Sequence, residues 1–312
     1  NVENACASGA NALHLAWLMA EAGLHRTVLA IGFEKANHED KQRTFSAYRA
    51  GFDFDEMPDF GEGSGEDRTP LVDRQAKLAQ GLMERHGLTE RSFATIAARS
   101  LANGARNPVA HRQFGGTVDD VLASRLVVPP ITTLMSSPVS DGAAAAVVRR
   151  VDGAPGARDV RIAASRLATR PPLGGDETPT ATTAVAQAAY EAAGIGPAEI
   201  DVAEVHDASV AYEVMAWEDT GLCPPGDELK WIETGHTEIG GPLPINPSGG
   251  LIARGHALGA SGIAQVHELV SQLRGEAGAR QVEGARVALA QVGGGVIAWQ
   301  TAVAAAHILV KD

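Results

Sequence analysis

The segment Asn246–Gly262, NPSGGLIARGHALGASG, is the most informative stretch of this chain. It is rich in glycine, and an apolar helical pattern starts in it and continues to about Leu273. His256 stands at the start of this pattern, flanked by Gly255 and Gly259. Glycines at such a place let backbone N–H groups approach a ligand closely. The segment lacks the Walker lysine and the Gly-x-Gly-x-x-Gly spacing, so the pattern disfavours a nucleotide-phosphate loop.

A second reactive group lies near the start of the chain, in the segment Asn4–Gly9, NACASG. Cys6 directly precedes an apolar helix predicted over residues 8–22, and the positive end of a helix favours the thiolate form. His206, which follows a predicted strand at 202–205, and His256 are the candidates to deprotonate it. A lone cysteine is more often a small buried hydrophobe, which is our interpretation of Cys223.

The bulk composition narrows the class of protein. A formal net charge of −12 argues against general nucleic-acid binding, which needs a basic surface. The early cations Arg43, Arg49, Arg68, Arg74 and Lys77 could still form a phosphate site, or be solvated surface charges. Two cysteines give neither a disulfide framework nor a metal-ligand spacing, so we expect a reducing cytoplasm and no metal. No apolar run approaches the roughly 20 residues of a membrane span.

Strands and helices alternate along the chain, which predicts doubly wound α/β layers. Residues 152–157, DGAPGA, are the best candidate for a linker between two domains. Gly293–Gly295 lies between the last two predicted strands, 287–291 and 296–305. It is interpreted either as a hairpin turn or as a backbone donor beside a reacting carbonyl. The predicted helices are 8–22, 71–86, 89–105, 178–193, 209–220 and the one that ends near 273, and the other strands are 27–33, 143–149, 160–168 and 202–205.

Four segments together resemble the thiolases, in particular the sterol-carrier-type or lipid-transfer-protein thiolases. Asn4–Gly9 is similar to the nucleophile motif and residues 140–147, SDGAAAAV, to the end of the first half. His206-Asp207 is similar to the pair in which the sterol-carrier branch has a histidine instead of asparagine. Asn246–Gly262 is the most specific match, and the resemblance covers essentially the whole chain.

The resemblance implies an α/β fold of two similar α/β/α halves, each with a five-stranded mixed sheet. Residues 1–152 would be an incomplete first half with a loop domain inserted at about 36–130, and residues 153–312 the second half. The chain starts with Asn, so we expect the first strand–helix units of that half to lie outside it. A homodimer would pack around a strand of which residues 1–5 remain.

The resemblance also implies acyl transfer with coenzyme A as co-substrate and no permanently bound cofactor. Cys6 would carry the acyl group, His256 would take the thiol proton, and His206 would join His256 in an oxyanion hole. Backbone N–H groups of Cys6 and Gly294 would form a second hole, where one donor is typically worth about 3 kcal/mol. To coenzyme A binding we assign Ser248, Gly249, Arg43 and Arg74.

One departure from the family pattern leaves alternatives open. Where thiolases have a second acid/base cysteine and the sterol-carrier branch a histidine, this chain has Gln291 or Val292, and neither can shuttle a proton. The leading hypothesis is an acyltransferase on acyl-CoA or 3-ketoacyl-CoA. The first rival is a retro-aldol lyase on a steroid- or lipid-derived CoA thioester, with a small OB-fold partner and with Tyr212 or Asp207 moving the proton. The second rival is a non-catalytic acyl-CoA-binding subunit.

Overall fold

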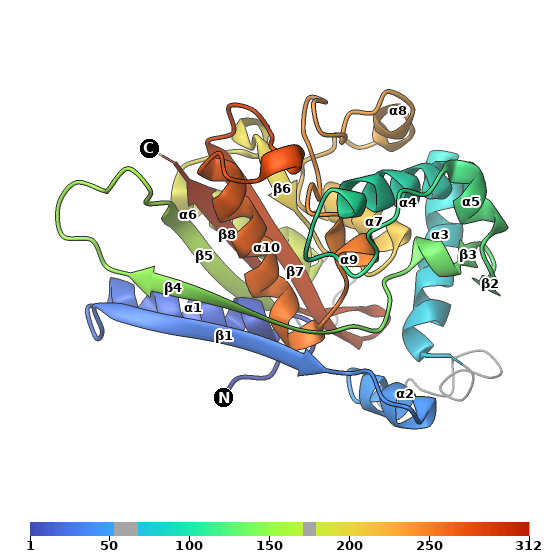
Figure 1. Ribbon diagram of the computed structural model, residues 1–312, viewed down its shortest axis with the longest axis horizontal. Coiled ribbons are helices and arrows are strands. Elements are labelled where there is room, and N and C mark those ends of the chain that lie inside the picture. The colour runs from blue at the N-terminus through green and yellow to red at the C-terminus, as the bar shows by residue number, and fades with distance from the viewer. Residues whose placement is uncertain (53–67, 171–178, 312) are drawn as a thin grey trace.

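The computed structural model describes residues 1–52, 68–170 and 179–311 and arranges them in alternating layers of strands and helices (Figure 1). The first layer is an antiparallel pair of strands, β1 (Thr27–Lys35) and β4 (Asp141–Arg149). Helices α1 (Ser8–Glu21) and α10 (Leu258–Leu273) pack between this pair and a four-stranded sheet. The order of the strands in that sheet is β5 (Arg161–Thr169), β8 (Gln300–Val310), β7 (Val287–Ile297) and β6 (Val202–Glu204).

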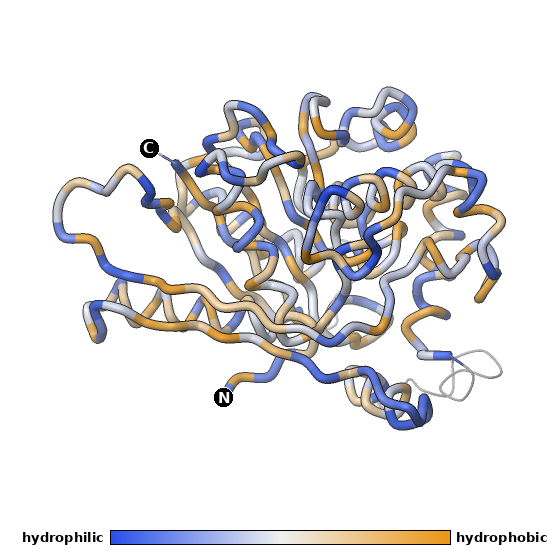
Figure 2. The backbone as a smooth tube through the Cα atoms, viewed as in Figure 1, coloured by the Kyte–Doolittle hydropathy of each residue, from blue (hydrophilic) through white to orange (hydrophobic). Residues whose placement is uncertain are grey.

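The four-stranded sheet is buried on both faces, as the alternation of its residues shows. Ala288 and Leu309 belong to the apolar cluster under α1 and α10. The adjacent Leu289 and Ile308 belong to a different cluster, which includes residues of α6 (Ala181–Ala193). Because successive residues of a strand point to opposite faces, α6 covers the face opposite to α1 and α10. Figure 2 shows the hydrophobic colours along β1 and the hydrophilic ones just beyond its end.

Most of the remaining elements lie in two excursions from these layers. The first, between β1 and β4, contains α2 (Lys41–Arg49), α3 (Pro70–His86), α4 (Glu90–Ala105), α5 (Val118–Ala123), β2 (Leu126–Val128) and β3 (Ile131–Thr132). The second, between β6 and α10, contains α7 (Val210–Asp219), α8 (Glu228–Glu233) and α9 (Gly250–Ala253). Among the described residues, short 3₁₀ turns span Thr133–Met135 in the first excursion, and Pro197–Glu199 and Gly278–Arg280 outside both excursions. Helices α3 and α4 pack against α7, so the two excursions meet. Within the described ranges, none of the helices has the length and apolar character needed to cross a membrane.

Three sequence-based expectations differ from the structure. The turn expected at Gly293–Gly295 is wrong: β7 runs through these glycines, and the turn lies at Ala298 and Trp299, whose φ angles are 48° and 60°. Residues 1–5 contain no strand: residues 1–3 have no regular structure, and a turn with a bridge between Asn4 and Cys6 follows them. The described residues give the second sheet four strands, where five were expected, and a single bridge between Ile245 and Ala203 beside β6.

Close approach of glycines brings the starts of α1 and α10 together. A Cβ on Gly9 would lie 2.6 Å from the Gly259 carbonyl oxygen, and one on Gly262 would lie 2.6 Å from the Ala10 nitrogen. The two helices therefore cross with almost no side-chain spacing. Cys6 lies just before α1 and His256 just before α10, so this crossing sets their separation.

We expect Gly262→Ala to lower the free energy of unfolding by about 1–3 kcal/mol, because the added methyl group forces the two helices apart. Urea denaturation of the purified protein measures the change. Gly115→Ala is the matched control: a Cβ on Gly115 would meet no other atom within 4 Å, so its effect should stay within about 0.5 kcal/mol. Equal stability of the two variants would contradict this account of the crossing.

Candidate active site

A cavity of about 490 Å³ opens beside the starts of α1 and α10. Three of the predicted site residues, Cys6, His206 and His256, line it together. Gly294 also lines it, from β7. The structure thus brings together residues from both ends and the middle of the chain at one cavity.

The cysteine and histidine at the two helix starts are in direct contact. His256 Nε2 lies 3.2 Å from Cys6 Sγ, and His256 Nδ1 lies 2.8 Å from Ser261 Oγ. The Ser261 hydroxyl donates its only proton to the Ala257 carbonyl, at 2.8 Å, so its oxygen must accept from Nδ1–H. This assigns the proton to Nδ1 and leaves Nε2 with a lone pair that faces the Cys6 sulfur. The geometry is that of a nucleophile with its general base.

A tight turn before α1 presents the cysteine to the cavity. Ala5 has a φ of 49°, in the left-handed region. Ser8 Oγ accepts from the Asn4 backbone N–H at 2.8 Å, and its single proton faces two acceptors, the Ala5 carbonyl at 2.7 Å and the Glu3 carboxylate at 2.9 Å. Gly294 of β7 packs directly against this turn, where a Cβ would collide with the Asn4 carbonyl oxygen. The glycine inside β7 is therefore required by the approach of the Cys6 turn, and not by a change of chain direction.

The resting pair is a neutral thiol beside a neutral imidazole. Burial raises the pKa of the Cys6 thiol to about 12, and the carboxylates of Glu34 and Glu3 add to the rise. Burial also lowers the pKa of His256 well below its usual value, helped by the neighbouring His206 and Arg254. The thiolate expected from the helix dipole is therefore not the favoured resting form, because desolvation outweighs the dipole.

Alkylation of Cys6 by iodoacetamide should therefore rise steadily between about pH 7 and pH 10. Only the thiolate reacts, and below a pKa of about 12 its fraction increases about tenfold per pH unit. Intact mass at timed intervals gives the rate, and the Cys6→Ala protein gives the background from the buried Cys223. A plateau of the rate below pH 8 would show that the thiolate is already formed and would contradict the assignment.

His206 lies beside this pair, and its imidazole makes no hydrogen bond to the described residues. Its ring centroid is 5.4 Å from that of His256 in an edge-to-face arrangement. Burial, with a smaller contribution from Arg74, lowers the pKa of His206 to about 3, so the imidazole is neutral. Neither ring nitrogen has a hydrogen-bond partner among the described residues. A neutral imidazole with a free N–H is a suitable donor to a ligand oxygen.

The two residues at the place of the second acid/base, and the two candidates to replace it, do not all lie in the cavity. Gln291 faces the cavity, and its side-chain oxygen accepts from the His206 backbone N–H at 3.1 Å. Val292 points the other way, into a small apolar cluster. Asp207 is fully buried and accepts from the Leu251 backbone N–H at 2.7 Å, so it caps α9 and does not line the cavity. Tyr212 does line the cavity.

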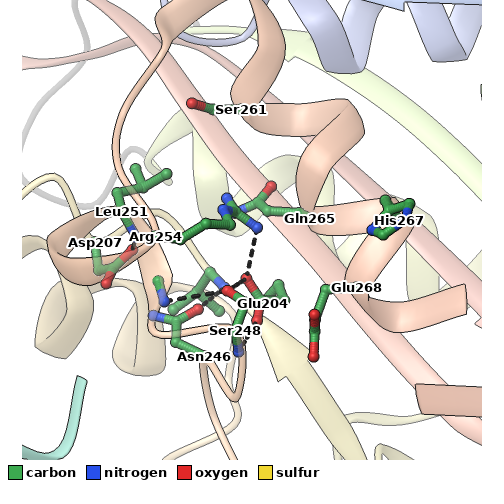
Figure 3. A network of polar contacts seen from close by, with 12 residues as sticks. Glu204, Asp207, Asn246, Ser248, Leu251, Arg254, Ser261, Gln265, His267 and Glu268 are labelled. Atoms are coloured by element: carbon green, nitrogen blue, oxygen red, sulfur yellow. Dashed lines mark hydrogen bonds and ion pairs between the residues drawn. The ribbon is translucent and has the colours of Figure 1, made fainter. Parts of the chain in front are cut away.

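The four residues assigned to coenzyme A binding separate into two pairs. Ser248 is fully buried, and its hydroxyl donates to Glu204 at 2.8 Å within the polar network of Figure 3. Gly249 packs against the backbone of α4, where a Cβ would lie 2.8 Å from Gly104. The structure does not bring either residue to the cavity, since both serve the packing of the loop before α9. Arg43 and Arg74 do line the cavity.

Two groups of side chains are close enough together to hold a metal ion, within the part of the chain that the structure describes. One is the set Cys6, His206 and His256, whose ligand atoms lie within 4.8 Å of one another. In the other, Glu218 and Glu228 approach different ring nitrogens of His86, at 3.0 and 3.1 Å. In that second group the His86 ring thus lies between the two carboxylates. The absence of a metal stays a prediction.

Sequence reasoning missed two residues of the site. Ser261, which orients His256, lies in the quoted Asn246–Gly262 segment five residues after the histidine, and this spacing was the available signal. Tyr48 lines the cavity from α2, and burial raises the pKa of its hydroxyl. Nothing local to the sequence of α2 indicates that approach.

The chain is similar to known proteins over most of its length. Residues 174–307 match the family described as "Thiolase C-terminal domain-like". An acetyl-CoA acetyltransferase of Methanothermobacter thermautotrophicus is 37% identical over 300 residues, which cover 94% of this chain and 76% of that protein. The chain belongs to the thiolase family.

Some relatives are much longer than this chain. Sterol carrier protein 2 of Bos taurus is 36% identical over 325 residues, which cover 95% of this chain and 57% of that protein. The chain thus spans a little over half of the length of that relative. Among solved structures, the Ltp2-ChsH2(DUF35) aldolase superposes with a TM-score of 0.77 at 23% identity, covering 99% of this chain and 78% of that one. The dimeric peroxisomal thiolase of Saccharomyces cerevisiae gives 0.62 at 16% identity, covering 99% and 75%. These two likenesses concern the fold alone.

Proposed function

We propose that the protein is a thiolase-like acyltransferase that acts on acyl-CoA or 3-ketoacyl-CoA through an acyl-enzyme on Cys6. The observation that carries the proposal is the 3.2 Å contact between Cys6 Sγ and the unprotonated Nε2 of His256. An arrangement kept only for packing has no need of a base held in one tautomer by Ser261. The retained pair also argues against a non-catalytic subunit.

The residues of the site account for each bond and proton in the acylation of Cys6. The Cys6 sulfur attacks the thioester carbon as its proton passes to His256 Nε2. His206 and the imidazolium of His256 stabilise the oxyanion of the tetrahedral intermediate by hydrogen bonds. The bond from carbon to the coenzyme A sulfur then breaks, and His256 returns the proton to that sulfur. A backbone N–H of Gly294 is proposed as a donor to the acyl-enzyme carbonyl, from its place against the Cys6 turn.

A retro-aldol lyase on a CoA thioester is the second candidate. Gln291 occupies the cavity wall where an acid/base would be needed for the full thiolase reaction, while Tyr212 offers a hydroxyl in the same cavity. A small OB-fold partner protein belongs to this alternative, and the structurally similar aldolase is itself named with a DUF35 component. Asp207 is a poor proton donor for this reaction, because it lies outside the cavity. The homodimer and the cytoplasmic compartment stay predictions for either function.

Intact mass spectrometry tests the proposal. Incubation of the full-length protein with acetyl-CoA or a longer acyl-CoA should add one acyl mass, located on Cys6 by peptide mapping. Cys6→Ala should remove the adduct, while Cys223→Ala should retain it, since Cys223 is buried away from the cavity. A folded wild-type protein that forms no adduct with any thioester would sink the acyl-enzyme scheme. Full retro-aldol turnover by Cys6→Ala would favour the lyase.

A further inference from the structure

Arg74 is a buried cation in the wall of the active-site cavity, and no carboxylate of the described residues forms an ion pair with it, although Arg74 is near enough to Asp219 to counteract the rise that burial causes in the pKa of that carboxyl. Arg74 is only 6% exposed to solvent. Nε donates to the Trp299 carbonyl at 2.9 Å, and Nη1 donates to the Tyr212 hydroxyl. Both acceptors are neutral, and none of the ion pairs between described residues includes Arg74. Since a buried charge is costly unless it is paired, a ligand anion in direct contact would add to the longer-range compensation that Asp219 supplies.

Most of the other interior arginines have a carboxylate partner, whereas Arg112, like Arg74, has no ion pair among the described residues. Three of them are paired with buried carboxylates: Arg99 with Glu213, Arg254 with Glu204 and Arg280 with Glu268. Figure 3 shows the pair made by Arg254. Arg112 donates to three backbone carbonyls. Arg74 uses two of the five N–H donors of a guanidinium, so a fork of donors remains for a ligand.

The position of Arg74 decides what kind of anion can reach it. Its guanidinium carbon lies 4.7 Å from the centre of the Tyr212 ring, and that ring lies 5.8 Å from the ring of His206. The charge is therefore close to the reacting thioester. The phosphates of coenzyme A are held away from the thioester by the long pantetheine arm. An anion at Arg74 must then belong to the acyl group.

A second cavity of about 360 Å³ adjoins the first at this residue. Arg74, Met215 and Thr301 line both cavities, and Lys77 lines the second one. The acyl side of the site thus continues past Arg74 into a space of mixed charge, lined by Lys77 and Arg85 and by the carboxylates of Glu218 and Asp219. A carboxylate matches the guanidinium fork, because it can accept two parallel hydrogen bonds.

We propose that Arg74 binds a carboxylate at the far end of the acyl group, so that the substrates are CoA thioesters of dicarboxylic acids. This inference rests on the proposed acyl-enzyme function and names the substrate class of that same site. Arg74 would act as a specificity-determining residue. A bidentate charged pair of this kind is expected to change the rate of acylation about 10- to 100-fold.

Matched acyl donors test the inference on the full-length protein. Glutaryl-CoA and adipyl-CoA are compared with pentanoyl-CoA and hexanoyl-CoA, which have the same chain lengths without the carboxylate. Single-turnover acylation of Cys6, followed by intact mass, should be about 10- to 100-fold faster for the better carboxylated donor. Arg74→Met should abolish that preference by slowing the carboxylated donors alone, and Arg74→Lys should keep part of it.

The outcomes separate the alternatives. Equal wild-type rates for both series would overturn the inference while leaving the acyl-enzyme intact, and this comparison needs no variant to fold. If Arg74→Met slowed both series by the same factor, Arg74 would be structural or would bind coenzyme A, and the inference would fail. Arg43→Met, at the exposed arginine of the same cavity, is the comparison for a common loss from weaker coenzyme A binding. Absence of acylation by every donor would defeat the proposed function and this inference with it.

Discussion

Replacing His256 by glutamine should slow the acylation of Cys6 by about 100- to 10,000-fold, the usual contribution of a general base. Glutamine keeps a polar group near the sulfur but cannot accept the thiol proton. Without that transfer the attack depends on the rare thiolate of a thiol whose pKa is about 12. Single-turnover acylation at neutral pH, followed by intact mass, measures the loss.

The variant should also change the pH profile of acylation. Since the base is gone, the remaining rate should climb about tenfold per pH unit towards pH 10, as the thiolate fraction does. His267→Gln is the control, because His267 is exposed on α10, the helix that follows His256, and does not line the cavity. A His256→Gln protein that acylates at the wild-type rate would remove His256 from the mechanism.

Replacing Glu204 by alanine should lower the free energy of unfolding by about 3–5 kcal/mol, the largest stability effect that we expect. Glu204 is fully buried at the end of β6, where it pairs with Arg254 at 3.3 Å and accepts from both the N–H and the hydroxyl of Ser248. Its loss leaves the guanidinium of Arg254 buried without a counter-charge (Figure 3). Burial raises the pKa of Glu204 to about 7. Chemical denaturation should therefore be measured at pH 8, where the Glu204 carboxylate is ionised.

A double variant and a surface control variant test the same prediction. Removing both charges, with Glu204→Met and Arg254→Met together, should recover a large part of the loss, because no unpaired charge then remains at this place in the interior. Asp227→Ala breaks the exposed pair with Lys230 and should change the stability by less than about 1 kcal/mol. A single Glu204→Ala variant as stable as Asp227→Ala would show that the buried network is not needed for the fold.

The sequence by itself determined the elements whose signals are local. The helical spacing of apolar and polar residues predicted a helix at 71–86, which the structure places at Pro70–His86, and Gly194 ends α6. The pairing of a helix-start cysteine with His206 and His256 also followed from residue types and their flanks, and the structure confirms that the three lie together. These features depend on a few neighbouring residues, which is why the linear pattern contains them.

Only the tertiary structure decided which side chains face the cavity and in what state. Ser248 belongs to a conspicuous motif, yet it turns inward to Glu204, a residue 44 positions earlier in the chain. Gly294 belongs to a glycine run that resembles a turn, yet it continues a strand because the Cys6 turn packs against it. Likewise Cys6 is a protonated thiol because distant elements bury it. Contacts between segments far apart in the chain fix burial, and burial fixes both the direction and the charge of a side chain, which no local pattern records.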